Sequence, residues 1–179
     1  MENHMRKQFA ILTLFLLALL QGCGTTGRSS DPGAPLDVYD PNAVTRVDAN
    51  DIRAGKLPAI LTDPSSILSR RSVYFALDRY DVTEEYRDLV TAHARFLVAN
   101  RQFKILIQGN TDERGSREYN LSLGQKRAES VRQMLLLLGV QDAQVEAVSL
   151  GKEKPRAEGS NEAAWAENRR SDILYAGEF

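Results

Sequence analysis

Two side chains of opposite charge, Asp112 and Arg127, offer binding chemistry within the segment QGNTDERGSREYNLSLGQKRAESV at residues 108–131. The carboxylate of Asp112 can accept hydrogen bonds from an ammonium group. The guanidinium of Arg127 can hold a carboxylate through two parallel N–H···O bonds. The pair therefore predicts a site for a ligand that carries both groups. It also suits an internal salt bridge that orients the loop, and the two interpretations are compatible.

The elements around this pair are predicted to bring the side chains together. A strand that ends at Gly109 delivers Thr111 and Asp112 to its carboxyl end, where α/β proteins commonly bind ligands. A helix predicted from Ser116 to Leu138 begins with free N–H groups that favour anions. Asn120, Gly124 and Arg127 lie at positions i, i+4 and i+7 of this helix and so share one face.

The remaining pattern predicts an α/β fold in which helices pack against one sheet as a two-layer sandwich. Strands are expected at 72–77, 103–109, 144–151 and 171–176, with a further helix opening at 83–85 and ending at Asn100 and a helical turn at 163–168. The apolar stripes predicted for the two long helices comprise Tyr86, Leu89, Val90, Ala94, Leu97 and Val98 in the first, and Leu121, Gly124, Ala128, Val131, Leu135 and Leu138 in the second.

The N-terminus has the order of an export signal, with basic Arg6 and Lys7 before an apolar run that is too short to span a bilayer. The sequence LQGC at residues 20–23 resembles the lipobox of bacterial lipoproteins. This resemblance implies a signal peptide at 1–22 and acylation of Cys23 by chains such as palmitate, and Gly24 favours the outer membrane of a Gram-negative cell. The alternative is that Cys23 is incidental in an ordinary export signal.

Residues 23–64 are rich in Gly, Pro, Ser, Asp and Asn and show no lasting apolar periodicity. We expect a lipidated flexible tether over 23–64, with a mean span on the order of 35 Å, and a compact domain over 65–179. The alternative is that the second half of this segment belongs to the domain, and Ala59 to Leu61 are candidates for local packing.

Several motifs resemble the OmpA C-terminal-like domain family, and most closely the peptidoglycan-associated lipoproteins within it: GNTDERGSREYNLSLGQKRAESV, then GV, SLGKEKP and NEAAWAENRRSDILY, over roughly 68–175. The resemblance implies a mixed four-stranded sheet. It also implies non-covalent binding of the peptidoglycan stem peptide, chiefly its diaminopimelate residue. The positions that match the family's ligand-binding motif are Thr111, Asp112, Asn120 and Arg127.

The family's Asn-Arg-Arg motif falls on Asn168, Arg169 and Arg170, which predicts either positive charge at the rim of the site or structural capping and pairing. Two positions depart from the family pattern. Ala76 replaces an acid of the first strand, and Asn110 replaces a histidine before the Thr-Asp pair. Trp165 matches an aromatic family position and is predicted to belong to the core rather than to stack on a ligand.

The resemblance further implies a place in the Tol-Pal system, with TolB and other Tol proteins as partners in envelope integrity and cell division. The alternative is a paralogous lipoprotein that acts mainly as a protein-interaction module. The net charge of −1 gives no reason to expect a nucleic-acid partner. Of the two histidines, His4 lies in the signal and only His93 remains, so we expect no enzyme, metal site or cofactor.

Overall fold

The computed structural model describes residues 57–179. Its helices are α3 (Ala59–Thr62), α4 (Arg87–Ala99), α5 (Arg117–Leu137) and α6 (Glu162–Asn168), and its strands are β1 (Ser72–Tyr74), β2 (Ile105–Asn110), β3 (Val145–Gly151) and β4 (Arg170–Tyr175). Three short 3₁₀ helices span Ile67–Ser69, Glu84–Tyr86 and Asp142–Gln144. The predicted signal peptide, Cys23 and most of the tether lie outside the described residues.

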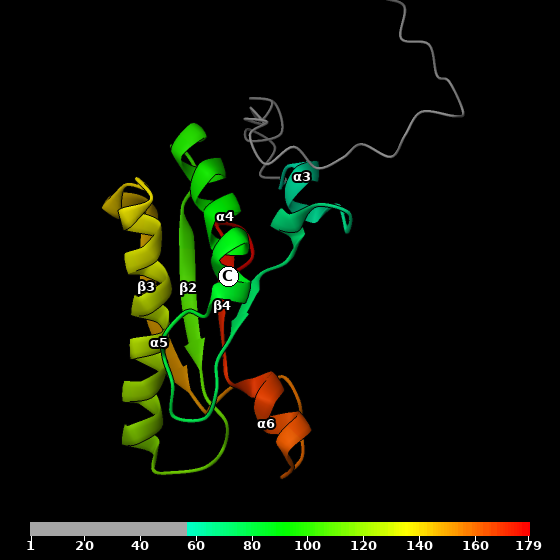
Figure 1. The fold of residues 1–179 in the computed structure, drawn as a ribbon, viewed down its shortest axis with the longest axis vertical. Helices are drawn as coiled ribbons and strands as arrows, with labels where there is room; N and C mark the ends of the chain where they lie inside the picture. Colours follow the sequence, from blue (N-terminus) through cyan, green and yellow to red (C-terminus); the bar gives the residue numbers. More distant parts are fainter. Residues whose placement is uncertain (1–56) are drawn as a thin grey trace, which may run out of the picture. The chain divides into compact units, whose positions relative to one another are not determined.

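The four strands form one mixed sheet in the order β1-β4-β2-β3 (Figure 1). Strands β2 and β3 are parallel, and α5 joins them as the crossover that parallel neighbours require. Strand β4 runs antiparallel to both β1 and β2. The predicted fold, a mixed four-stranded sheet with helices, is therefore confirmed.

The two faces of the sheet differ in chemistry because side chains alternate along each strand. On one face Ile107 of β2 and Ile173 of β4 are paired, and both are fully buried in the core to which α4 and α5 contribute. On the other face Gln108 is paired with Asp172, and Asp172 in turn with Ser72 of β1. This second face is polar along the middle of the sheet.

Helix α5 lies close against the sheet because two glycines meet there. A Cβ atom on Gly109 would overlap the backbone of Gly124, and one on Gly124 would overlap the Ser149 side chain. A side chain at Gly109 would force the helix to move, and one at Gly124 would displace the Ser149 hydroxyl and crowd the Gly109 carbonyl. This contact sets the height of α5 above the end of β2, and thereby the position of the charged residues on the helix.

The predicted apolar stripes are correct in part. Leu121 (52% exposed), Leu138 (40%) and Val98 (39%) were expected in the core but lie on the surface. On α5 the buried face instead includes the polar residues Asn120 and Arg127. A stripe predicted from apolar residues alone is rotated away from the true face, because two polar side chains occupy core positions.

The packed part of the chain begins before the predicted boundary at residue 65. Leu61 of α3 is only 1% exposed and belongs to the same core as the strands, and Leu68 is buried nearby. Residues 57–64, which the tether was expected to include, therefore lie in the domain. Within residues 57–179, no helix has both the length and the apolar character needed to cross a membrane.

Candidate functional site

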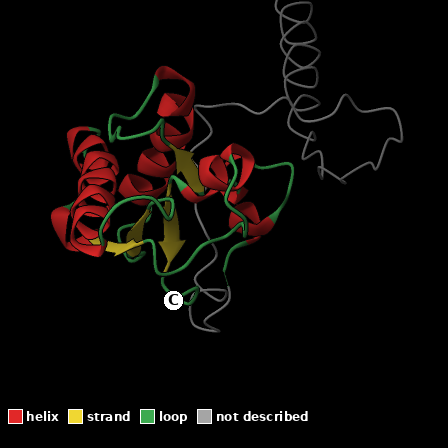
Figure 2. Cartoon of the chain, turned by 90° about the horizontal axis from the view of Figure 1, so that it is seen from below, coloured by secondary structure: helices red, strands yellow, loops and turns green. Residues whose placement is uncertain are grey.

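Loops gather at the end of the sheet to which the β2 arrow points (Figure 1), and the view from below shows them crossing the strand ends (Figure 2). The loop after β2 carries Thr111 and Asp112, turns at Gly115 with a φ of 90°, and enters α5 at Ser116. The Ser116 side chain accepts a hydrogen bond from the Tyr119 backbone N–H and so caps the helix, which begins one residue after the predicted start.

Asp112 is 5% exposed, and arginines surround its carboxylate. Arg114 donates to it from Nη2 (2.7 Å), from Nε (3.1 Å) and from the backbone N–H (3.1 Å), while Nη1 of Arg169 lies 3.5 Å away. Burial opposes the charge on Asp112, but the hydrogen bonds from Arg114 outweigh it and hold the pKa of the carboxyl below its usual value. Asp112 is therefore an ionised acceptor.

Arg127 is fully buried, at 0% exposure, and its guanidinium bonds to backbone. Nε donates to the carbonyl of Arg79 (2.8 Å), Nη1 to that of Asn110 (2.9 Å) and Nη2 to that of Ala76 (3.2 Å). Burial lowers the pKa of Arg127 to about 10, so the group remains charged at neutral pH. Arg127 thus fastens the loop after β1 to the end of β2.

The internal salt bridge between Asp112 and Arg127 does not form. Among residues 57–179, the ion-pair partners of Asp112 are Arg114 and Arg169. The charge of Asp112 nevertheless acts on Arg127 and raises its pKa against the effect of burial. The two groups are near neighbours that are each satisfied by other partners.

The predicted residues Thr111, Asp112, Asn120 and Arg127 do come together, because all four line one cavity. Its volume is about 20 Å³, which is enough for about one water molecule. Leu77, Asp78, Arg114, Tyr119 and Leu123 complete its walls. Asn120 is 2% exposed and donates to the carbonyl of Arg114 (2.8 Å), so it ties the loop to the helix.

Arg169 and Arg170 lie inside the protein and not at a rim. Both are almost fully buried, at 6% and 5% exposure. Arg169 donates to the carbonyl of Phe75 (3.0 Å) and pairs with Glu162 (2.7 Å), in addition to its approach to Asp112. Arg170 pairs with Asp172 (2.9 Å). The alternative of structural pairing describes both side chains, and Arg169 also neighbours the site.

Ala76 and Asn110, the two positions that depart from the family pattern, both form hydrogen bonds within the protein. The backbone carbonyl of Ala76 accepts a hydrogen bond from Arg127, a contact that does not depend on the side chain at this position. Asn110 donates from Nδ2 to the carbonyl of Gln108 (3.0 Å), and its Oδ1 has no hydrogen-bond partner among residues 57–179. Asn110 thus keeps a polar group at the end of β2 without filling its hydrogen-bonding capacity.

Trp165 is half-buried, and its surroundings are those of the site rather than of the core. The guanidinium of Arg114 lies over its ring, 4.0 Å from the centroid, and its indole N–H donates to Glu113 (3.0 Å). Sequence reasoning missed Arg114 as the main partner of Asp112. The available signal was its spacing, because a cation two residues after an acid in a tight loop can fold back onto it.

Asp112, Glu113 and His93, the side chains that were considered for chemistry, each bond to other groups within the protein. The Asp112 carboxylate pairs with arginines, whereas that of Glu113 bonds to Trp165. The two neighbouring acids are therefore not arranged to act together on one bond of a substrate. His93 is buried in α4 between Tyr175 and the carbonyl of Arg70. In the described part of the chain, no three His, Cys, Asp or Glu side chains are grouped so as to hold a metal ion.

Comparison with known proteins adds family evidence to this geometry. The OmpA family model matches residues 74–169. A peptidoglycan-associated lipoprotein of Pseudomonas aeruginosa is 36% identical over 166 residues, covering 93% of this chain and 95% of the relative. One from Pasteurella multocida is 48% identical over 104 residues, covering 58% of this chain and 69% of that protein.

Solved structures with a similar fold include a protein of the same name as these relatives. The crystal structure of the peptidoglycan-associated lipoprotein from Burkholderia pseudomallei is 62% identical with a TM-score of 0.64, and the match covers 65% of this chain and 98% of that one. The C-terminal domain of Helicobacter pylori MotB shares the fold at 19% identity and a TM-score of 0.56, covering 60% and 84% of the two chains.

Proposed function

Because this chain belongs to the OmpA family and its relatives are peptidoglycan-associated lipoproteins, we propose that its domain binds peptidoglycan non-covalently and links the outer membrane to the wall. The ligand is the stem peptide, and specifically the diaminopimelate residue, whose side chain carries an ammonium and a carboxylate. The observation that carries this proposal is the convergence of Asp112 and Arg127, one acid and one base, on a single cavity.

The ammonium of the ligand binds Asp112 by replacing Arg114. The carboxylate is already saturated by Arg114, and the cavity beside it has room for little more than a water molecule. Arg114 is the part of the site that can move, because its side chain is 34% exposed while that of Asp112 is 6% exposed. Exchange of one cation for another keeps the buried carboxylate paired throughout.

The carboxylate of the ligand binds the two N–H groups of Arg127 that are not bonded to backbone carbonyls. A guanidinium has five N–H donors, and three of them are used on backbone carbonyls. One N–H remains on each terminal nitrogen, and Arg127 lines the cavity. Because the carbonyls fix the guanidinium, its remaining donors are preorganised and cost little entropy on binding.

The rest of the chain turns this binding into attachment of the envelope. Cys23, when lipidated at the new N-terminus that follows removal of residues 1–22, anchors the protein in the outer membrane from its periplasmic face. The tether allows the domain to reach the wall. Many copies on one surface convert a modest affinity at each site into firm attachment, because every further contact forms at high effective concentration.

A protein partner is a second candidate for the same end of the domain. Three large side chains are exposed there, Leu77 (50%), Tyr80 (47%) and Tyr119 (47%), and two of them also line the cavity. Exposed apolar groups beside a polar site suit a protein interface. TolB is the candidate partner in the Tol system, with a role in cell division, and its binding would compete with that of the wall.

Sedimentation with purified sacculi tests the proposal. Asp112→Asn keeps the shape of the side chain but removes the charge that holds the ammonium, and we expect the affinity to fall about 100-fold. Asp81→Asn is the matched control, since it removes an exposed acid from the neighbouring loop. Retention of wild-type affinity by Asp112→Asn would refute the assigned site.

Sacculi of two chemical types test the choice of ligand. Diaminopimelate sacculi are expected to bind better than lysine sacculi, which lack the carboxylate that Arg127 would hold. The same incubations are expected to release no soluble wall fragments, and their release would point to an enzyme instead. Capture of TolB by a domain that ignores both types of sacculi would favour the protein-interaction role.

A further inference from the structure

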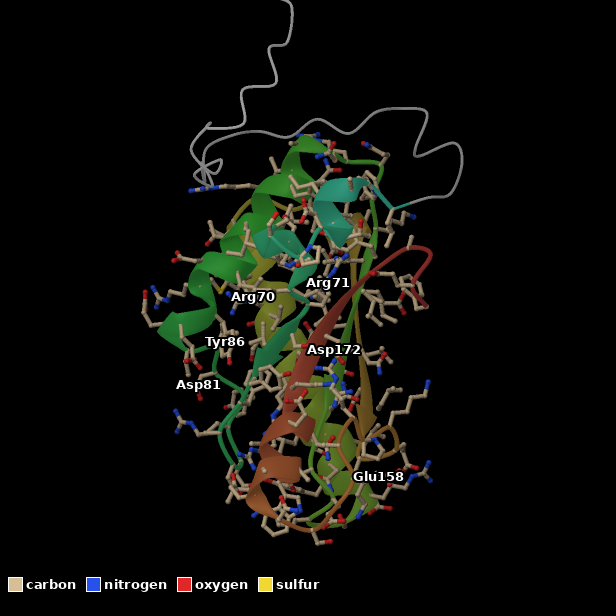
Figure 3. The ribbon with its side chains drawn as sticks, turned by 90° about the vertical axis from the view of Figure 1, so that its right-hand side faces the viewer. Arg70, Arg71, Asp81, Tyr86, Glu158 and Asp172 are labelled. Atoms are coloured by element: carbon tan, nitrogen blue, oxygen red, sulfur yellow. The ribbon has the colours of Figure 1, made fainter. Side chains whose placement is uncertain are left out.

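A second cavity lies on the other side of the loop that carries Asp112. Its volume is about 290 Å³, close to the lower end of the range for small-molecule sites, which begins near 300 Å³. The segment between β3 and α6 forms one wall with Pro155, Ala157, Glu158 and Gly159, and Thr111, Glu113, Lys152, Trp165 and Asn168 form the others. Figure 3 shows Glu158 on this segment, at the edge of the domain.

Two of the three charged side chains that line this cavity, Lys152 and Glu113, bond to groups within the protein. Lys152 donates to the backbone carbonyls of Glu113 (3.1 Å) and Gly115 (2.8 Å). The Glu113 carboxylate accepts from Ser160 and from the indole N–H of Trp165, and these bonds lower the pKa of Glu113. The one remaining lining charge, the Glu158 carboxylate, lies at the exposed edge, so an anionic ligand would find no free counter-ion inside the cavity.

One neutral polar group of the lining, the Thr111 hydroxyl, lacks a hydrogen-bond partner within the described protein. Thr111 is 3% exposed, and its hydroxyl Oγ1 has no hydrogen bond within the described protein. Buried polar atoms without partners are uncommon and cost stability. In residues 57–179, three further such atoms lie near it where β2 ends and β4 begins, on Asn110, Arg170 and Ser171. A hydroxyl both donates and accepts, so it suits hydroxyl and amide groups equally.

We propose that this second cavity is a subsite for an uncharged group bearing hydroxyls and an amide, namely an N-acetylated amino sugar. The inference rests on the proposed function, because such sugars carry the stem peptides of the wall. Thr111 lines both cavities, and two amino-acid residues, a span of about 7 Å, join the sugar to diaminopimelate, so a ligand with its diaminopimelate at Asp112 can place its sugar in the neighbouring cavity. Glu158 at the edge is exposed and can accept from sugar hydroxyls.

Trp165 supplies a direct measurement, because it lines the second cavity and is the only tryptophan in the chain. Its fluorescence is titrated with a tripeptide ending in diaminopimelate, with and without the disaccharide attached. We expect the form with sugars to bind about tenfold more tightly. We also expect it to shield Trp165 from acrylamide quenching, as the sugar-free tripeptide does not.

Ala157→Leu is the decisive variant, since it fills the cavity from a half-buried wall position and leaves the Asp112 side untouched. It should abolish the tenfold advantage of the sugars and leave affinity for the sugar-free peptide unchanged. If Ala157→Leu fails to fold, the quenching comparison on the wild-type protein decides alone.

Equal affinity of the wild-type domain for the two peptides, with equal quenching, overturns the subsite while the proposed function stands. Failure of both peptides to bind overturns both proposals. A sugar-free tetrapeptide is the remaining arm of the experiment. If its additional alanine gives the advantage that Ala157→Leu removes, the occupant is peptide and the assignment to a sugar is wrong.

Discussion

Two buried aspartates in this domain are each held by two arginines, but they have different surroundings. Asp112 and Asp172 are both 5% exposed. Each has one buried arginine, Arg169 or Arg170, which are neighbours in the chain. Each also has one arginine that is about one third exposed, Arg114 for Asp112 and Arg156 for Asp172.

The partners differ in how firmly they hold the carboxylate. The buried arginine lies 3.5 Å from Asp112 but 2.9 Å from Asp172, which also accepts a hydrogen bond from the Ser72 hydroxyl at 2.7 Å. Asp172 lies within β4, between β1 and β2, where Figure 3 labels it on the strand. Asp112 lies on a loop and lines a cavity. The same charge pairing is therefore enclosed within the sheet at Asp172, whereas at Asp112 it borders a cavity beyond the end of the sheet.

The largest effect on stability is expected at the structural aspartate. Asp172→Ala leaves the guanidinium of Arg170 buried without its partner, and such a change lowers the free energy of unfolding by about 3–5 kcal/mol. Urea denaturation measures this loss. At temperatures where the variant is folded, its affinity for sacculi should equal that of the wild type. Lost affinity in a folded Asp172→Ala domain would remove the distinction between the two aspartates.

The next largest effect on the free energy of unfolding is expected from His93, which is buried and uncharged, and this effect depends on pH. The Nε2–H of His93 donates to the carbonyl of Arg70, so Nδ1 accepts from the Tyr175 hydroxyl at 2.9 Å. Burial lowers the pKa of His93 to about 4, from 6.5 in the unfolded chain. The unfolded state therefore binds more protons between these values, and stability falls as the pH drops from 6.5 to 4, by about 3 kcal/mol in all.

Urea denaturation at a series of pH values tests this prediction, with His93→Gln as the variant that cannot titrate. Carboxyls with lowered pKa values lose their contribution mainly below their unfolded values, about 4 for Asp112 and about 4.5 for Glu113. The interval from pH 6.5 to 4.5 therefore reports on the histidine. An equal slope for His93→Gln in this interval would contradict the assignment.

The third prediction concerns Arg127, which lines the cavity and is also fixed by three hydrogen bonds to backbone carbonyls. Arg127→Lys retains the charge but cannot reach the three carbonyls of Ala76, Arg79 and Asn110 together. Leaving buried carbonyls unpaired should lower the free energy of unfolding by about 2 kcal/mol, and affinity for sacculi should fall as well. An unchanged unfolding curve would show that the carbonyl bonds are dispensable.

Much of the fold could be predicted because local signals agree with it. The cap at Ser116, the glycine after α5 at Gly139 and the alternation in β2 place their elements within a few residues. The boundary at residue 65 failed for a different reason. Leu61 is buried in a core whose other members are distant in sequence for the most part, and a four-residue helix has no periodicity to detect it.

The candidate site was predictable in its residues but not in its pairings. The spacing of Asn120 and Arg127 on one helix face brings both to the cavity, as observed. Which arginine pairs with Asp112 depends on the fold of the 111–116 loop and on the ring of Trp165, which lies in another element. Sequence spacing within one helix carries no information about either.

The smallest effect is expected from the exchangeable partner, and its sign is the informative part. If Arg114 competes with the ammonium of the ligand for Asp112, Arg114→Leu should raise affinity for the sugar-free diaminopimelate tripeptide. The pair is partly exposed, so its loss should contribute about 1 kcal/mol, or about a fivefold gain, measured by calorimetry. Arg117→Leu removes an exposed arginine that pairs with Glu153 instead, and it serves as the control for net charge. A loss of affinity in Arg114→Leu alone would mean that Arg114 holds the ligand, and that Asp112 positions Arg114 rather than the ammonium.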